Sequence, residues 1–185
     1  MSAAGTSLPY SDGLRPGEEE LEYACDRFLP GAADSYHRAA DVDAPAPVLF
    51  RWLCQLRAAP YSYDLIDNFG RRSPRRLTPG LEMLERGQRF MTIFDLVEFE
   101  PDVHISLLCM RWRRVFGEVG GTYLIVPRPD GGCRLIVKVV ANHPGPRIES
   151  ALRARLLPWG DLVMMRKQLR TLAALAEREA ARASA

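Results

Sequence analysis

Hydrophobic positions near the C-terminal end of the chain recur at the spacing of one helical face. The apolar residues fall at three- and four-residue steps: Leu162, Met165, Leu169, Leu172 and Ala176. Asp161 is a suitable N-cap for this run, and Pro158 and Gly160 predict a break from any earlier helix. The pattern therefore predicts a long amphipathic helix over residues 161–179, which needs a broad apolar surface to lie on.

Alternating apolar and polar positions before this helix predict the surface that it needs. We expect strands over residues 35–42, 89–99, 104–112, 116–126 and 133–140. In the last of these, Leu135 and Val137 alternate with Arg134 and Lys138, which is typical of a sheet with one face in water. Short turns separate the later strands, so the predicted sheet is antiparallel, and a sheet of this size curls.

The rest of the chain predicts short helices and a loose start. Residues 1–17 are small, polar and rich in Gly and Pro, as in a loose tail. Helical spacing predicts short helices over residues 18–28, 47–56 and 147–157. The order of elements predicts the α+β class, with a curved antiparallel β-sheet gripping the long C-terminal helix. We expect a partly loose N-terminal extension over residues 1–34 and a single domain over residues 35–182.

Composition and charge narrow the class of function. The chain has 185 residues, of which 47% are hydrophobic, and this is long enough for one domain with a sizeable core. The net charge of +2 gives no support for a nucleic-acid partner. No apolar run approaches the roughly 20 residues of a membrane helix, and the N-terminus lacks the pattern of a signal peptide. We therefore expect a cytoplasmic protein with no nucleic-acid or membrane partner.

Cysteine and histidine positions give no sign of a metal or a cofactor. The four cysteines are widely scattered, and no pair has metal-ligand or redox spacing. They are typical of buried, free thiols in a reducing compartment. The histidines at positions 37, 104 and 143 show neither HxH nor HExxH spacing, and no phosphate-binding or dinucleotide-binding glycine motif is present. We expect no metal site and no cofactor.

The segment of residues 60–76 holds the densest group of chemically useful side chains. Its candidates are Tyr61, Tyr63, Asp64, Asp67, Asn68, Arg71, Arg72, Arg75 and Arg76. The spacing of Asp64 and Asp67 puts both carboxylates on one side of a helical turn, where partial burial raises a carboxyl pKa and suits it to acid or base work. The arginines are suited to binding a carboxylate or a phosphate. Alternatively, Asp64 and Asp67 pair with these arginines and only hold the loop in shape.

A second group of candidates lies at the start of the terminal helix. Backbone amides at a helix start bind anions, so Trp159 and Asp161 are candidates for contact with an anionic group. Asp161 alternatively serves only as the cap. Arg166 lies one turn further along the helix, and we expect it to pair with Asp161 or with the loop acids.

Several stretches of the chain resemble one known superfamily. DVDAPAPVLFRWL, residues 41–53, resembles the point where its first strand meets a Pro-flanked helix, and the terminal helix resembles its gripped helix. CQLRAAPYSYDLIDNFGRRSP, residues 54–74, and LPWGDLVMMRKQL, residues 157–169, resemble an actinobacterial subfamily described as polyketide cyclase/dehydrase-like. Residues 35–180 thus resemble the START-like, or SRPBCC, superfamily with its helix-grip fold. That superfamily holds carriers, receptors and enzymes on one scaffold.

The resemblance implies an elongated apolar cavity between the concave sheet face and the terminal helix. Residues that would line it are Phe90, Phe94, Leu96, Leu107, Tyr123, Leu135, Val137, Trp159 and Met165. The alternative interpretation is that these residues are plain core. The other ligand-binding candidates come from the neighbouring helices and the loop: Trp52, Tyr61, Asn68, Asp161 and Arg166.

Three functions follow as hypotheses. The first is a cofactor-independent cavity protein that acts on an apolar or polyketide-like small molecule through positioning and acid–base assistance. Its catalytic residues would be Tyr63, Asp64, Asp67 and Arg71. The second is a non-catalytic carrier of a lipid or other hydrophobic ligand, with the loop as its lid. The third is an interaction module whose N-terminal arm, residues 18–28, docks on a second subunit. We expect a monomer or a homodimer.

Overall fold

The fold is built around one curved β-sheet. The computed structural model describes residues 7–67 and 70–183. Within them, seven strands hydrogen-bond in the order β1-β2-β7-β6-β5-β4-β3. The strands are β1 (Ser11–Asp12), β2 (Asp34–Val42), β3 (Arg89–Phe90), β4 (Phe94–Glu100), β5 (His104–Leu108), β6 (Glu118–Pro127) and β7 (Cys133–Asn142). Neighbouring strands are antiparallel except β1 and β2, which are parallel.

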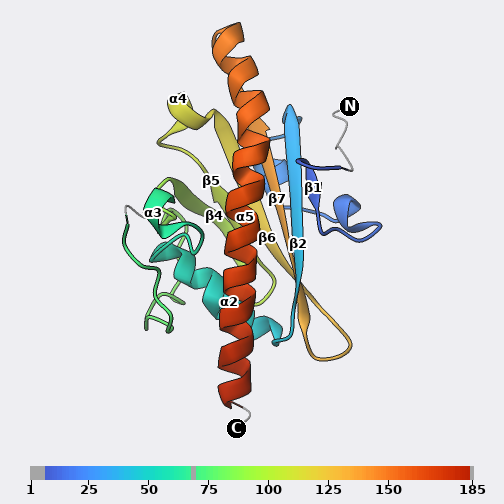
Figure 1. Cartoon of the computed structure of the whole chain (residues 1–185), viewed down its shortest axis with the longest axis vertical. Helices are drawn as coiled ribbons and strands as arrows, with labels where there is room; N and C mark the ends of the chain where they lie inside the picture. Colours follow the sequence, from blue (N-terminus) through green and yellow to red (C-terminus); the bar gives the residue numbers. More distant parts are fainter. Residues whose placement is uncertain (1–6, 68–69, 184–185) are drawn as a thin grey trace.

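A single long helix lies across this sheet. Figure 1 shows α5 running the length of the molecule in front of the strands, with α2 beside it. The helical segments are η1 (Glu18–Glu20), α1 (Cys25–Phe28), α2 (Ala46–Cys54), η2 (Gln55–Arg57), α3 (Asp64–Asp67), α4 (Arg113–Phe116) and α5 (Arg147–Ala183). The predicted fold class is therefore confirmed: a curved, mostly antiparallel sheet grips a long C-terminal helix.

Apolar side chains from α2, the sheet and α5 form the main core. Leu49 and Leu53 of α2, Val137 of β7 and Leu172 of α5 are completely buried in it. Complete burial of an aliphatic side chain of this size stabilises the fold by about 1.5–3 kcal/mol. The helical stripe predicted from the sequence therefore does hold α5 against the concave face of the sheet.

The opposite face of the sheet is covered by the N-terminal segment. A small second core there holds Tyr23, Cys25, Ile136 and Val140. Arg134 forms an ion pair with Glu18, and Lys138 Nζ lies 2.8 Å from a carboxylate oxygen of Asp26. The prediction that this face is in water is wrong, because the N-terminal segment covers it. The carboxylates of Glu18 and Asp26 in that segment pair with the two cations of the face. The arm expected to dock on a second subunit lies on its own sheet.

The described part of the N-terminal extension, residues 7–34, is held more closely than the loose tail expected for residues 1–17. The edge strand β1 pairs with β2, and Arg15 Nη2 donates to both carboxylate oxygens of Asp41 at 3.0 and 2.8 Å. The continuous helix predicted over residues 18–28 is wrong. Only η1 and α1 are helical, because Leu21 has extended backbone angles that carry the chain on toward the sheet.

Two predicted strands are shorter than expected. The strand predicted over residues 89–99 is a hairpin, because Met91 and Thr92 adopt φ angles of 45° and 68° and turn the chain between β3 and β4. The strand predicted over residues 104–112 ends at Leu108, where the chain leaves the sheet and then forms α4. The strands predicted to start at residues 35, 116 and 133 are present with small shifts of their ends.

The terminal helix is much longer than predicted. One helix runs over Arg147–Ala183, so the break predicted at residues 158–160 is wrong. A proline inside a helix removes a backbone hydrogen bond and costs about 3 kcal/mol. Burial of Pro158 offsets this cost, and Arg38 Nη2 donates to the Pro158 carbonyl at 3.4 Å. Asp161 therefore lies in mid-helix and is not an N-cap. Neither α5 nor any other described helix has the length and apolarity needed to cross a membrane.

Candidate functional site

A chain of buried hydrogen bonds crosses the interface between α5 and the concave sheet face, which we call the seam. The Tyr123 hydroxyl of β6 donates to Gln168 Oε1 of α5 at 2.6 Å, and Gln168 Nε2 donates to the Pro60 carbonyl at 2.7 Å. Burial raises the pKa of Tyr123, and the charge of Asp161 adds to that effect, so the phenol is a neutral hydrogen-bond donor. The seam therefore contains a satisfied polar network within an apolar core.

Two methionine sulfurs surround this network. Met165 Sδ of α5 lies 3.7 Å from the Tyr123 hydroxyl oxygen, and Met91 Sδ lies 3.9 Å from it. Met91 Sδ is also 3.1 Å from Gln168 Nε2. Thioether side chains are flexible and polarisable, so they repack around groups of different shape. The polar centre of the seam is thus bordered by the most adaptable apolar side chains available.

Several buried polar atoms of the described residues have no hydrogen-bond partner, and two of them lie beside the seam next to α2. They are Trp52 Nε1 of α2 and Tyr61 Oη, and both side chains are about 1% exposed. The two rings meet edge to face, with their centroids 6.1 Å apart. Burial raises the pKa of Tyr61 to about 12, so its hydroxyl also stays protonated. Because buried polar groups normally have partners, this pair marks a place where a hydrogen-bonding group is expected.

Strained backbone converges on the same place. Among the described residues, four that are not glycine have positive φ, and three of them are Tyr61 at 57°, Met91 at 45° and Thr92 at 68°. Each such residue costs of order 1–3 kcal/mol, and such residues cluster at binding and catalytic sites. The Met91 amide donates to the Leu56 carbonyl at 2.9 Å, which ties the β3–β4 turn to the chain just before Tyr61.

A buried ion pair extends the polar line along α5. Asp161, Met165 and Gln168 lie at i, i+4 and i+7, so they share the face that meets the sheet. Asp161 Oδ2 is 2.7 Å from Arg38 Nη2 of β2, in an ion pair whose alignment falls short of a hydrogen bond. Burial raises the pKa of Asp161 to about 6, although Arg38 opposes the shift. This carboxyl group therefore titrates in the range of a general acid or base.

The loop residues predicted to be catalytic lie outside this network. Tyr63 is 40% exposed, and Arg71 is exposed. Asp64 begins the predicted helical turn and accepts hydrogen bonds from the Ser73 hydroxyl at 2.5 Å and the Ser73 amide at 2.9 Å. These contacts support the interpretation that Asp64 holds the loop in shape, through a serine rather than an arginine. The side chain of Asp67, and Asn68 as a whole, lie outside the described residues.

Most of the predicted ligand-binding residues come together in the seam. Trp52, Tyr61, Phe90, Leu107, Tyr123 and Met165 belong to one buried cluster, and Phe94 packs against it half-buried. In this structure they are in contact as core, in line with the second interpretation of their pattern. Trp159 does not join them, because it is 54% exposed on the outer side of α5.

Arg166 is also turned away from the seam. Its Nε and Nη2 atoms donate to the two carboxylate oxygens of Asp12 in β1, at 2.6 and 2.7 Å. The prediction that it pairs with Asp161 or the loop acids is wrong, because β1 brings an unforeseen carboxylate to that side of α5. The Arg166 guanidinium holds the pKa of Asp12 below its usual range.

Three central residues were not found from the sequence: Gln168, Met91 and Arg38. A signal existed for Gln168, since it is a polar residue in register with the buried stripe of a helix. Arg38 gave a weaker signal as a cation within a predicted strand. Met91 gave none, because its role depends on a turn that interrupts an apparently regular strand pattern.

Comparison with known proteins defines the fold. No protein-family model matches the chain, and no curated protein matches it by sequence. Solved structures do match. The di-domain ARO/CYC StfQ from the steffimycin biosynthetic pathway is 14% identical, with a TM-score of 0.53 over 80% of this chain and 51% of StfQ. The chain thus spans about half the length of that protein.

Two other structures match over nearly their whole length. A Helicobacter pylori protein is 13% identical, with a TM-score of 0.52 over 84% of this chain and 95% of its own. A Thermobifida fusca protein solved by NMR is 16% identical, with a TM-score of 0.51 over 78% of this chain and 93% of its own. At such identities the likeness establishes a shared fold and nothing further.

Proposed function

We propose that this chain binds a largely apolar small molecule in the seam, beneath the segment of residues 60–76. The observation that carries the proposal is the pair of buried, unpartnered polar atoms, Trp52 Nε1 and Tyr61 Oη, beside the Tyr123–Gln168 hydrogen bond. Strained backbone at Tyr61 and Met91 adds support, since such strain persists mainly at functional sites.

The donors and walls of the seam define the ligand's chemistry. Trp52 Nε1 offers only a donor, and the protonated Tyr61 hydroxyl offers a second. The walls are apolar side chains that include the adaptable Met91 and Met165. We therefore expect an apolar ligand with one or two carbonyl or hydroxyl oxygens as acceptors. The polyketide-like class expected from the sequence has this character.

Entry requires the segment of residues 60–76 to move away from α5. Within the described residues of this segment, Asp64 accepts two hydrogen bonds from Ser73, which tie the two ends of its central part together. Its link to α5 within the described residues includes the hydrogen bond from Gln168 to the Pro60 carbonyl. When the Gln168–Pro60 hydrogen bond breaks, new hydrogen bonds from Tyr61 and Trp52 to an acceptor on the ligand would compensate for its loss. The segment would then act as a lid.

Binding of prodan, a neutral fluorescent aromatic ketone, tests the proposal. We expect saturable binding with a blue shift of the emission, because the probe leaves water for the seam. Tyr61→Phe removes one donor and should weaken binding about three- to tenfold. Tyr63→Phe makes the same chemical change on an exposed neighbour and should leave the affinity unchanged. Equal affinities for the wild type and Tyr61→Phe would overturn the assignment of the site.

A second candidate function is acid–base catalysis on such a ligand, and Asp161 is the observation that favours it. Its buried carboxyl group has a pKa raised to about 6 and lies one helical turn from Met165. As a base it would take a proton from a carbon next to a ligand carbonyl. The resulting enolate would add to another carbonyl of the same molecule, and the alkoxide formed would recover the proton from Asp161. No atom is gained or lost overall, which describes an intramolecular aldol cyclisation.

A linear β-triketone provides the test of catalysis. We expect Asp161→Asn to abolish cyclisation while prodan binding persists, and Asp64→Asn to retain the wild-type rate because Asp64 is occupied by Ser73. The opposite result would favour the loop assignment to Tyr63, Asp64, Asp67 and Arg71, which stays a prediction. Binding of prodan with no turnover by the wild type would favour the carrier function.

A further inference from the structure

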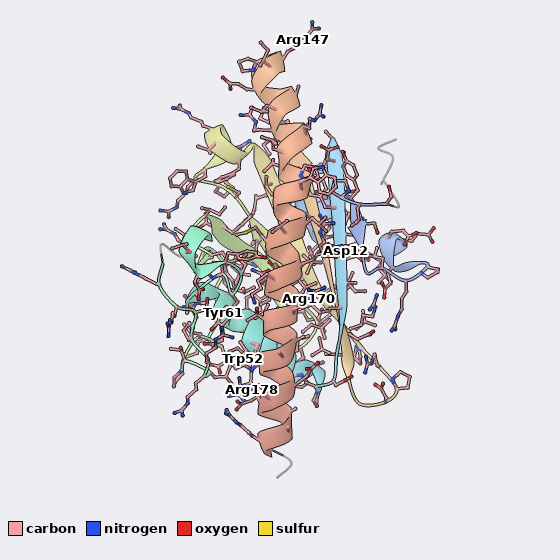
Figure 2. All side chains as sticks on the ribbon, in the orientation of Figure 1. Asp12, Trp52, Tyr61, Arg147, Arg170 and Arg178 are labelled. Atoms are coloured by element: carbon pink, nitrogen blue, oxygen red, sulfur yellow. The ribbon has the colours of Figure 1, made fainter. Side chains whose placement is uncertain are left out.

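A shallow groove lies on the outer side of α5, away from the sheet. Its volume is about 190 Å³, and its lining residues are Arg75, Lys167, Arg170, Thr171, Ala174, Leu175 and Arg178. All but Arg75 belong to α5, and Arg75 comes from the segment of residues 60–76. Figure 2 places Arg170 and Arg178 along the C-terminal half of α5, with Trp52 and Tyr61 to one side of the helix.

Four cations surround this groove without a matching carboxylate. Within the part of the chain that the structure describes, Arg75, Lys167, Arg170 and Arg178 form no ion pair. Like charges at such helical spacings repel one another. The adjacent Arg166, by contrast, has its own carboxylate partner in Asp12. The charge of Arg170 also helps to lower the pKa of Asp12, but Asp12 is already paired with Arg166, so the groove keeps an excess of positive charge.

We propose that this groove binds a phosphate group. Four positive charges around so small a volume exceed what a single carboxylate balances, whereas a phosphate monoester carries close to two negative charges and three acceptor oxygens. The guanidinium groups of Arg75 and Arg170 offer the forked donors that such oxygens accept. Ala174 and Leu175 give the groove an apolar floor, which suits a phosphate attached to a carbon chain.

This site is separate from the seam. Leu175 contributes to the groove but is 3% exposed and belongs to the main core, so α5 stands between the groove and the sheet. The groove cations on α5 therefore do not depend on the proposed function, whereas Arg75 lies on the segment that moves when the seam opens. It assigns a second class of ligand, an anion, to a surface that the apolar seam does not use.

Titration calorimetry at low ionic strength with inorganic phosphate, glycerol 1-phosphate and vesicles containing phosphatidic acid tests the groove. Arg170→Glu should weaken phosphate binding at least about tenfold, because it removes a charge-assisted hydrogen bond and adds repulsion. Arg155→Glu changes the same charge on an exposed part of α5 outside the groove, so we expect a much smaller effect.

The three probes also identify the source of the phosphate. Tighter binding of glycerol 1-phosphate than of inorganic phosphate supports a soluble ester, and selective binding of the vesicles supports a lipid headgroup. Equal weakening by Arg170→Glu and Arg155→Glu would show diffuse attraction to a basic surface and would overturn the proposal. Lack of binding of all three probes by the wild type would overturn it as well.

A different feature of α5 carries a second proposal. Five large apolar residues are 51–85% exposed and follow one outer face of the helix at steps of three and four: Ile148, Leu152, Leu156, Trp159 and Val163. Figure 1 shows this N-terminal part of α5 extending past the ends of the strands. Continuous apolar stripes of this kind are typical of interaction surfaces.

We propose that this stripe pairs with the same stripe of a second copy, antiparallel and about a two-fold axis near Leu156. In that arrangement Ile148 faces Val163 and Leu152 faces Trp159, so the stripe complements itself as a two-fold interface requires. The five residues expose on the order of 600 Å² together. With their polar flanks they approach the roughly 800 Å² per partner of a standard interface.

Sedimentation analysis over a wide concentration range tests the pairing. We expect the wild type to dimerise and Leu156→Lys, at the centre of the stripe, to be monomeric because it places charges at the axis. Met83→Lys makes a similar change at another exposed apolar residue and should leave the dimer intact. A wild type that stays monomeric at the highest concentration, or equal effects of the two substitutions, would overturn the proposal.

Discussion

Replacing Tyr123 and Gln168 singly and together measures the hydrogen bond at the centre of the seam. Tyr123→Phe removes the hydroxyl and leaves Gln168 Oε1, which lies 2.6 Å away in the wild type, as a buried acceptor without its donor. A buried polar group without a partner costs about 1–3 kcal/mol. Gln168→Leu leaves two groups unpaired, the Tyr123 hydroxyl and the Pro60 carbonyl, so we expect a loss of about 2–4 kcal/mol.

The double substitution should be less harmful than the two single effects added together. With both side chains apolar, only the Pro60 carbonyl lacks its partner. We therefore expect the free energy of unfolding of the double variant to exceed the additive value by about 1–2 kcal/mol. Urea unfolding measures this coupling, provided that all four proteins share one m-value. Prodan binding should nevertheless weaken in the double variant, because the polar centre of the seam is gone.

A matched cycle with Tyr23 controls for nonspecific effects of losing a tyrosine hydroxyl. Tyr23 is buried on the other face of the sheet, and its hydroxyl donates to the Glu18 carbonyl at 2.5 Å. Tyr23→Phe combined with Gln168→Leu should be additive to within about 0.5 kcal/mol, because the two sites share no partner. If the Tyr123–Gln168 pair is equally additive, the buried hydrogen bond has no energetic role and the account of the seam is refuted.

Three further predictions concern charge and burial. The pKa of Asp161 is raised to about 6, so its contribution to stability is present below about pH 4 and is lost as pH rises through 6. The stability of the wild type relative to Asp161→Asn should therefore fall by up to about 3 kcal/mol between pH 4 and pH 7, measured by urea unfolding. Glu18→Gln breaks the nearly buried pair with Arg134 and should cost about 1–3 kcal/mol in thermal unfolding; no change would contradict the close packing of the N-terminal segment. All four cysteines are buried, with thiol pKa values raised by burial, so a thiol reagent at pH 8 should label none of them before unfolding; rapid labelling would contradict this.

Local periodicity predicted the framework of the fold well. The stripe of Leu162, Leu169 and Leu172 packs in the core as expected, and the alternation in β7 places Leu135 and Val137 on the concave face. These patterns are reliable because burial of one face acts on each residue separately. The helical turn beginning at Asp64 was predicted for the same reason, since it depends on neighbouring residues only.

Interactions between distant residues explain what the sequence did not reveal. Pro158 is a strong local signal for a helix end, but its burial and the contact with Arg38, 120 residues earlier, keep α5 continuous. The same continuity turns Asp161 from an apparent cap into a largely buried acid in mid-helix. The surroundings of Asp161 and Arg166 on α5 are thus set by partners in β1 and β2 that no local pattern identifies.

The two halves of the seam have different physical tasks. Beyond Gln168 the contacting residues of α5 are apolar, and Leu172 and Ala176 are completely buried there. Apolar packing of this kind holds the helix in place but contains no polar group that could bind a ligand instead. Between Asp161 and Gln168 the contacts include polar ones beside Leu162 and Met165, and an ion pair or a hydrogen bond can be replaced by one to a ligand at little net cost. The strained backbone of Tyr61 and Met91 also lies at this polar half, and such strain is found mainly at functional sites. Ligand entry is therefore expected at the polar half, while the apolar half keeps the fold intact.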